Sequence, residues 1–207
     1  MKLKKLLLTL IVLILLLPYQ QINAESESPD ITAGAALLMD SKTSKILYSK
    51  NENEKMYPAS TTKIMTAILT IENCNLDDIV TVPYDAIATI PSGYSIAALQ
   101  TGEQLTVNQL LQLMMVHSAN DAANVLAFHV AGSLESFATM MNTKVAELGL
   151  EHTHFLNPSG MHNEDHYTTA YDLAKLMQYC MKNSTFRTIA GLKFCTVPAT
   201  NKYGERI

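Results

Sequence analysis

A serine and a lysine three residues apart, Ser60 and Lys63, form the first pair whose types and spacing could do chemistry. Pro58 and Ser60 favour a helix start, and positions i and i+3 share one face of a helix. A serine hydroxyl becomes a nucleophile when a base takes its proton, and burial can lower the pKa of a lysine enough to make it that base. The first-turn N–H of Ser60 could also stabilise an oxyanion.

From the residues alone, this pair can also be a helix cap and a surface charge. A chain of 207 residues holds roughly one S-x-x-K by chance, and capping by serine is routine. The context favours chemistry, because the helix predicted from about Thr61 to Ile71 is apolar nearly all round. A lone lysine on such a buried helix needs a functional reason.

A second candidate is the break Ser118-Ala119-Asn120, which lies between two apolar stretches, "LLQLMMV" and "AANVLA". Its hydroxyl could relay a proton, and its amide could hold a substrate carbonyl. The pattern itself is weak, because Ser49-Lys50-Asn51 repeats it at the exit of a predicted hairpin, where we expect surface. Its position as a polar island between helices is the more telling signal.

Four histidines crowd one loop, with Glu164 and Asp165 beside them: His152, His154, His162 and His166. A zinc site is the alternative to weigh. The loop has no helical H-E-x-x-H and contains Asn-Pro and Gly breakers, so we expect solvated loop histidines and no metal.

Periodicity and caps predict the elements that must position these residues. Thr106 with Gln109 makes a capping box, Ser133 can cap a later helix, and Gly149 ends it. The predicted elements are, in chain order, a hairpin over residues 33–50, the helix over 61–71, a strand over 77–83, helices over 106–116, 121–131, 134–148 and 170–181, and a strand that enters a hairpin within 193–207.

Composition and the N-terminus limit the class of protein. Hydrophobic residues are 48%, charged residues 16% and the net charge −4, which argues against disorder and nucleic-acid binding. Residues 1–24 have the layout of a secretory signal peptide, with three lysines, a short apolar run and a small-residue end. We therefore expect a secreted protein, acting outside the cytoplasmic membrane. Cys180 and Cys195 could form a bridge, although buried free thiols are favoured.

Three segments together resemble a known family. "YPASTTKIMTA", "HSANDAANVLA" and "LNPSGMHNEDHYTTAYDLAKLM" are similar to the penicillin-binding serine D-alanyl-D-alanine carboxypeptidases, the low-molecular-mass penicillin-binding proteins. That superfamily carries S-x-x-K, S-D-N and K-T-G motifs, and the second reads S-A-N here. The resemblance covers roughly residues 33 to 207.

The resemblance implies an α+β, β-lactamase/transpeptidase-like fold, in which the early hairpin and the late strands feed one antiparallel sheet beside a helical region. It implies that Ser60 is the acyl-enzyme nucleophile, Lys63 its general base, Ser118 a proton relay to the leaving amine, and Asn120 a contact to the substrate backbone. The reaction would remove the terminal D-alanine of a peptidoglycan stem peptide at the cell wall. β-Lactams would trap the same serine, and no metal or cofactor is implied.

The third motif is where this sequence departs from the family. It contains no K-T-G, and Lys42-Thr43-Ser44 falls on the hairpin turn. We therefore expect residues 25–207 to be a partial catalytic domain, truncated before the K-T-G strand. Two alternatives stay open: a non-catalytic penicillin-binding remnant, and a serine β-lactamase, which would need a deacylating glutamate where this chain has "NPSGMHNEDHYTT".

Overall fold

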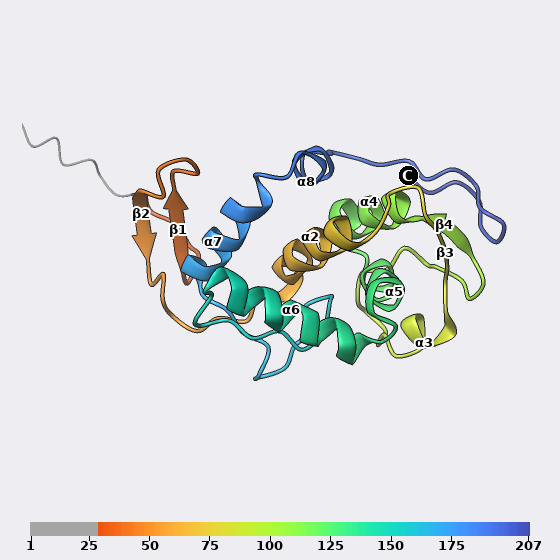
Figure 1. Ribbon diagram of the computed structural model, residues 1–207, viewed down its shortest axis with the longest axis horizontal. Helices are drawn as coiled ribbons and strands as arrows, with labels where there is room; N and C mark the ends of the chain where they lie inside the picture. Colours follow the sequence, from red (N-terminus) through yellow and green to blue (C-terminus); the bar gives the residue numbers. More distant parts are fainter. Residues whose placement is uncertain (1–28) are drawn as a thin grey trace, which may run out of the picture. The chain divides into compact units, whose positions relative to one another are not determined.

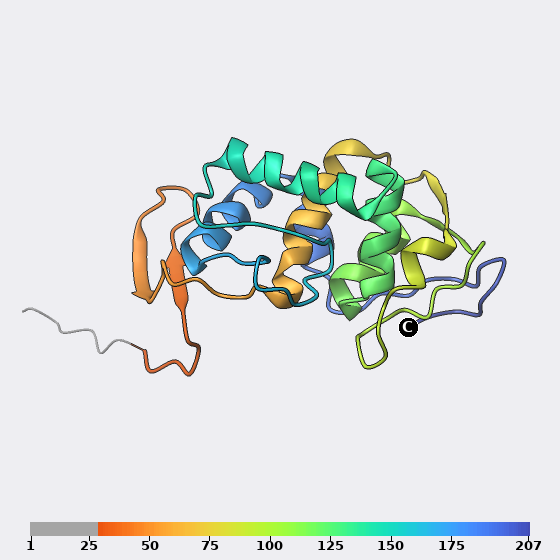
Figure 2. The same ribbon diagram turned by 90° about the horizontal axis from the view of Figure 1, so that it is seen from below.

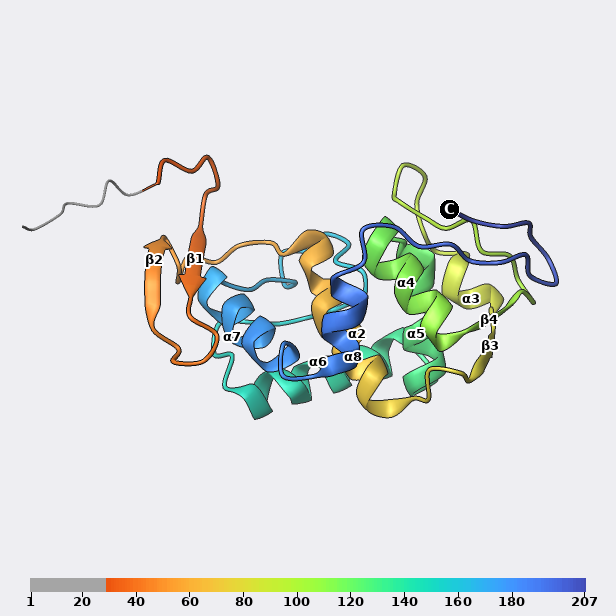
Figure 3. The same ribbon diagram turned by 90° about the horizontal axis from the view of Figure 1, so that it is seen from above.

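The helix that carries Lys63 lies among five of the later helices of the chain. A computed structural model describes residues 29–207, of which 33–207 belong to the larger of two units into which the chain divides. The predicted signal peptide lies outside the described residues. Figure 1 shows α2 (Lys63–Asn73) between α7 and the pair formed by α4 and α5. Figure 3 shows the same order, and Figure 2 shows α6 extending along the row.

The helices packed against α2 bury it on almost every side, as the apolar sequence predicts. Its residues from Met65 to Thr70 are all buried. The neighbours of α2 are α4 (Val107–His117), α5 (Asn120–Ala131), α6 (Leu134–Leu148), α7 (Ala170–Cys180) and α8 (Ser184–Ala190).

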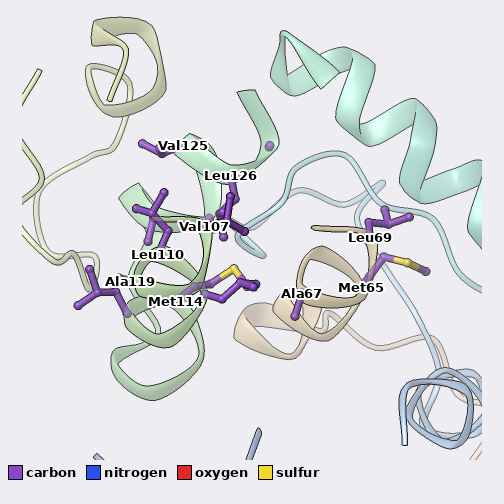
Figure 4. Close-up of a cluster of buried hydrophobic side chains, with 14 of the residues drawn as sticks. Met65, Ala67, Leu69, Val107, Leu110, Met114, Ala119, Val125 and Leu126 are labelled. Atoms are coloured by element: carbon purple, nitrogen blue, oxygen red, sulfur yellow. The ribbon is translucent and has the colours of Figure 1, made fainter. Parts of the chain in front are cut away.

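The core shown in Figure 4 forms where α2 meets α4 and α5. The labelled side chains are no more than 3% exposed: Met65, Ala67, Leu69, Val107, Leu110, Met114, Ala119, Val125 and Leu126. Full burial of a leucine or valine side chain contributes about 1.5–3 kcal/mol. This core holds α2, and with it Lys63, in a fixed position.

The strands form two small antiparallel sheets. The predicted hairpin is confirmed as β1 (Ala36–Met39) paired with β2 (Ile46–Lys50). The predicted strand at 77–83 is confirmed as β3 (Ile79–Thr81), which pairs with β4 (Gln104–Thr106). The α+β class holds, with the strands divided between two sheets.

The late segment does not join the early hairpin, contrary to the expectation of one shared sheet within residues 29–207. Val197 pairs with Arg206, so the predicted hairpin is present in short form. Asn201 accepts from the backbone N–H of Gln104 at 2.8 Å, and Arg206 pairs with Glu103. These polar contacts hold the tail beside β4.

The helix caps predicted at Thr106, Ser133 and Gly149 are confirmed. Thr106 and Gln109 form a reciprocal capping box at α4. The Ser133 hydroxyl accepts the N–H of Ser136 at the start of α6, and Gly149 ends that helix with φ 61°. Local side-chain chemistry therefore sets these boundaries.

Three short elements were missed by the sequence patterns: α3 (Tyr84–Ile87), β4 and α8. Each has seven residues or fewer, too few to show a period. Cys180 and Cys195 are buried free thiols, which confirms the favoured alternative, and no disulfide joins the cysteines of the described residues. Within residues 29–207, no helix has the length and apolar character needed to cross a bilayer.

Candidate active site

Ser60 lies in η1 (Ala59–Thr62), a 3-10 turn that leads directly into α2. The α-helix therefore starts at Lys63, two residues later than predicted. The Ser60 side chain caps no backbone group in this turn, so its hydroxyl is left for other contacts. Ala59 has φ 46°, a left-handed conformation that an alanine adopts only under constraint.

The constraint on Ala59 comes from Gly160. A Cβ added to Gly160 would lie 1.7 Å from the Ala59 carbonyl oxygen, so only glycine allows this approach. Gly160 belongs to a turn, Asn157–Gly160, whose Asn157 Oδ1 accepts from the N–H groups of Ser159, Gly160 and Met161. One asparagine thus shapes the turn that presses against the residue preceding Ser60.

The side-chain nitrogen of Lys63 is surrounded by three oxygen acceptors. Nζ lies 2.7 Å from Asn120 Oδ1, 2.7 Å from the carbonyl oxygen of Ser159 and 3.3 Å from Ser60 Oγ. Lys63 is 2% exposed, and no carboxylate among residues 29–207 pairs with it. An uncompensated buried ammonium is costly, so burial shifts the protonation equilibrium of Lys63 toward the neutral amine.

Burial lowers the pKa of Lys63 from 10.5 to about 8. A neutral amine has two N–H donors and one lone pair. The two 2.7 Å contacts use both donors, on Asn120 Oδ1 and on the Ser159 carbonyl. The lone pair then faces the Ser60 hydroxyl at 3.3 Å, which is the arrangement of a general base and its nucleophile.

Ser118 and Asn120 meet this pair from the break between α4 and α5. Ser118 ends α4 in a left-handed conformation, φ 56°, and its Oγ lies 2.8 Å from Ser60 Oγ. Asn120 begins α5 and is 5% exposed. Because Asn120 Oδ1 accepts from Lys63, the amide nitrogen of the side chain is the group left to donate to a ligand.

The prediction that His166 is a solvated loop residue is wrong, because its side chain is only 1% exposed. Its Nδ1 accepts the N–H of Leu156 at 3.0 Å, so Nε2 carries the proton and donates to Thr62 Oγ1 at 2.8 Å. Burial, with His154 and His162 nearby, lowers its pKa to about 4. No cluster of His, Cys, Asp or Glu placed to hold a metal ion occurs within residues 29–207.

The structure brings all four predicted site residues together: Ser60, Lys63, Ser118 and Asn120. The contact of Lys63 with the Ser159 carbonyl was not predicted from the sequence, because a backbone group is present in every residue and no residue type marks it. The asparagine, proline and glycine at positions 157–160 do predict a turn. That turn was the available signal for a segment beside the site.

Comparison with known proteins gives consistent similarities. The family model described as "D-alanyl-D-alanine carboxypeptidase", Peptidase_S11, matches residues 22–200. The D-alanyl-D-alanine carboxypeptidase DacF of Bacillus subtilis is 36% identical over 198 residues, 91% of this chain and 50% of that protein. The D-alanyl-D-alanine carboxypeptidase of Streptomyces sp. strain K15 is 38% identical over 189 residues, 86% of this chain and 64% of that protein.

Solved structures agree with these sequence matches. A point mutant of the Streptomyces K15 DD-transpeptidase aligns with a TM-score of 0.80 at 35% identity, over 86% of this chain and 73% of that one. Penicillin binding protein 6B from Escherichia coli aligns with a TM-score of 0.77 at 33% identity, over 87% and 60%. The chain spans only half the length of the Bacillus relative.

Proposed function

The chain belongs to the D-alanyl-D-alanine carboxypeptidase family, and on that premise we propose that it is a serine-type carboxypeptidase that removes the terminal D-alanine from peptidoglycan stem peptides. Ser60 is the nucleophile, Lys63 the general base, Ser118 the proton relay, and Asn120 the contact to the substrate backbone. The observation that carries the proposal is the buried amine of Lys63, which faces the Ser60 hydroxyl with its two other directions occupied.

Acylation follows from this geometry. Ser60 Oγ attacks the carbonyl carbon of the penultimate D-alanine, and its proton passes to Lys63 Nζ. The bond to the terminal D-alanine breaks, and the proton taken up by Lys63 passes through Ser118 Oγ, which lies 2.8 Å from Ser60 Oγ, to the leaving nitrogen, so that Lys63 is neutral again. A free D-alanine and a Ser60 ester result. Water then attacks the ester carbonyl, Lys63 takes a proton from that water, and the proton returns to Ser60 Oγ as the ester bond breaks.

Substrate contacts and stabilisation come from groups beside the nucleophile. The amide NH₂ of Asn120 donates to a carbonyl of the stem peptide. Ser60 lies in the first turn of η1, where backbone N–H groups have no intrahelical acceptor, so its N–H is available to stabilise the developing oxyanion. A β-lactam places its strained amide at the same position, so it acylates Ser60. No cofactor takes part in this reaction, and its place is the cell wall outside the cytoplasmic membrane.

The test is covalent labelling with a fluorescent penicillin, followed by release of D-alanine from a peptide ending in D-alanyl-D-alanine. We expect the protein to become labelled and Ser60→Ala to abolish labelling. Ser184→Ala, which alters an exposed serine on α8, is the matched control and should label like the wild type. Labelling that persists in Ser60→Ala would exclude Ser60 as the nucleophile.

The peptide assay separates the alternatives. Labelling without D-alanine release would indicate a penicillin-binding remnant that does not act on the peptide. Rapid loss of label with release of opened penicillin would indicate a serine β-lactamase. Among residues 29–207, no carboxylate forms a hydrogen bond or an ion pair with Ser60 or Lys63, which argues for a slow loss of label.

A further inference from the structure

The loop segment Ser95–Leu99, here named the strap, runs beside the break that carries Ser118 and Asn120. Ser95, Ile96 and Ala98 are exposed, whereas Leu99 is buried in the core. Apolar packing therefore holds the Leu99 end of the strap, and polar contacts of its backbone hold the rest. These contacts come from both sides of the strap.

Ser95 holds both ends of the break. Its carbonyl oxygen accepts the N–H of Asn120, the first residue of α5, at 2.9 Å. Its hydroxyl donates to the carbonyl oxygen of His117, the last residue of α4, at 2.7 Å. Ser118, with its left-handed backbone, lies between these two anchors. The position of Ser95 therefore sets how the break is held against Ser60.

The inner side of the strap is anchored by Asp121. One carboxylate oxygen accepts the N–H of Ala97 at 2.9 Å, and the other accepts the N–H of Leu99 at 3.0 Å. Asp121 is 2% exposed. Asp121 thus binds the N–H groups of Ala97 and Leu99, and the carbonyl oxygens of Ala97 and Ala98 remain for a different partner.

The outer side is anchored by Arg206. Its Nε donates to the carbonyl oxygen of Ala97 at 2.8 Å, and one terminal nitrogen donates to that of Ala98 at 3.3 Å. The same guanidinium forms a two-pronged pair with Glu103, at 2.7 and 2.9 Å, and lies 4.0 Å from the centre of the Tyr203 ring. Arg206 thus joins the strap to the start of β4.

A buried ion pair of this kind seldom stabilises a fold, because desolvation offsets the attraction. Glu103 is 0% and Arg206 8% exposed. The planar guanidinium can reach two carbonyls and two carboxylate oxygens at once, which the single nitrogen of a lysine cannot do. The arrangement is therefore better suited to fixing geometry than to adding stability.

We propose that Arg206 is a positioning residue for the serine–lysine site: with Glu103 it clamps the strap, and the strap, through Ser95, holds Ser118 in register with Ser60. This inference rests on the proposed function for its effect on rate. It extends that function by assigning a role to a residue that contacts none of the reacting groups.

The test compares Arg206→Lys with Arg187→Lys, which alters an exposed arginine on α8. We expect Arg206→Lys to slow penicillin acylation by about tenfold to a hundredfold, the usual cost of a misplaced catalytic group, while the control keeps the wild-type rate. Amide exchange should become faster over residues 95–99 and 117–121 in Arg206→Lys alone. An unchanged acylation rate with unchanged exchange would overturn the proposal.

A double mutant separates positioning from general destabilisation. Ser95→Ala removes the hydroxyl that holds His117 and keeps the carbonyl that holds Asn120, so Arg206→Lys added to it should slow acylation by clearly less than the product of the two single losses. Multiplying rate losses would refute the route through Ser95. If the wild type takes up no penicillin, the proposed function fails, and amide exchange at 117–121 alone then supports or overturns the clamp.

Discussion

Asn120→Asp should move the pH dependence of acylation to higher pH. In the proposed mechanism acylation needs the neutral amine of Lys63, whose pKa is about 8 in the wild type because of burial. About one tenth of the lysine is neutral at pH 7 and about nine tenths at pH 9, so the rate should rise about tenfold across that range. The substitution keeps the size of the side chain and adds a negative charge.

The size of the shift follows from the distance. The new carboxylate would stand where Asn120 Oδ1 now lies, 2.7 Å from Lys63 Nζ. Two unit charges at that separation attract by about 6 kcal/mol at an effective dielectric constant of about 20, and desolvation of the carboxylate offsets part of this. Shifts of about 1–3 pKa units are usual for such pairs. A rise of about two units would lower the rate at pH 7 about a hundredfold.

The assay is stopped-flow acylation by a fluorescent penicillin from pH 6 to 10.5. Asn120→Asp also removes the substrate contact proposed for the Asn120 amide, and this loss should lower the plateau rate without moving the inflection. Asn120→Ala is the control, since it loses the same contact without adding charge, and its inflection should stay at or below that of the wild type. An inflection for Asn120→Asp at or below pH 8 would refute Lys63 as the titrating base.

Two further predictions concern the surroundings of the site. Gly160→Ala should lower both the melting temperature and the acylation rate, because its Cβ would meet the Ala59 carbonyl; Gly132→Ala, with a similar φ of 78° but open space, should cost stability alone. The pKa of His166 is about 4, so the unfolded chain binds a proton at this histidine before the folded chain does. The free energy of unfolding should therefore fall by up to about 3 kcal/mol as pH falls from about 6.5 to 4. Unfolding measured across that range should show a flatter decline for His166→Gln and an unchanged one for His129→Gln, which alters an exposed histidine; equal slopes would contradict the burial argument.

The sequence predicted those parts of the site that depend on contacts close in the chain. Ser60 and Lys63 are three residues apart, and Ser118 and Asn120 are two apart. Each pair can therefore be recognised within a short stretch of sequence, the first at a helix start and the second in a helix break. The caps at Thr106, Ser133 and Gly149 are equally local. Such features follow from hydrogen bonds within one turn.

Contacts between distant segments could not be predicted in the same way. His166 bonds Thr62 across 104 residues, and its loop composition alone gave the wrong expectation of solvent exposure. The strap depends on Arg206, 109 residues from Ala97. The third hydrogen-bond partner of Lys63 is the carbonyl oxygen of Ser159. Every residue has such an oxygen, so no residue type marks Ser159 for that role.

The site concentrates unfavourable conformations that the packed helices must offset. Ala59, Ala98 and Ser118 each have positive φ, at a cost of order 1–3 kcal/mol for a non-glycine residue. Burying Lys63 adds about 3 kcal/mol below pH 8, since its pKa lies below that of an unfolded lysine, and this cost declines only as pH rises from about 8 to 10.5. A relaxed backbone and a solvated lysine would be more stable, but they would separate the side chains of Lys63, Ser60 and Ser118. The apolar contacts of α2 with α4 and α5 therefore maintain the site geometry, although none of those side chains contacts a reacting group.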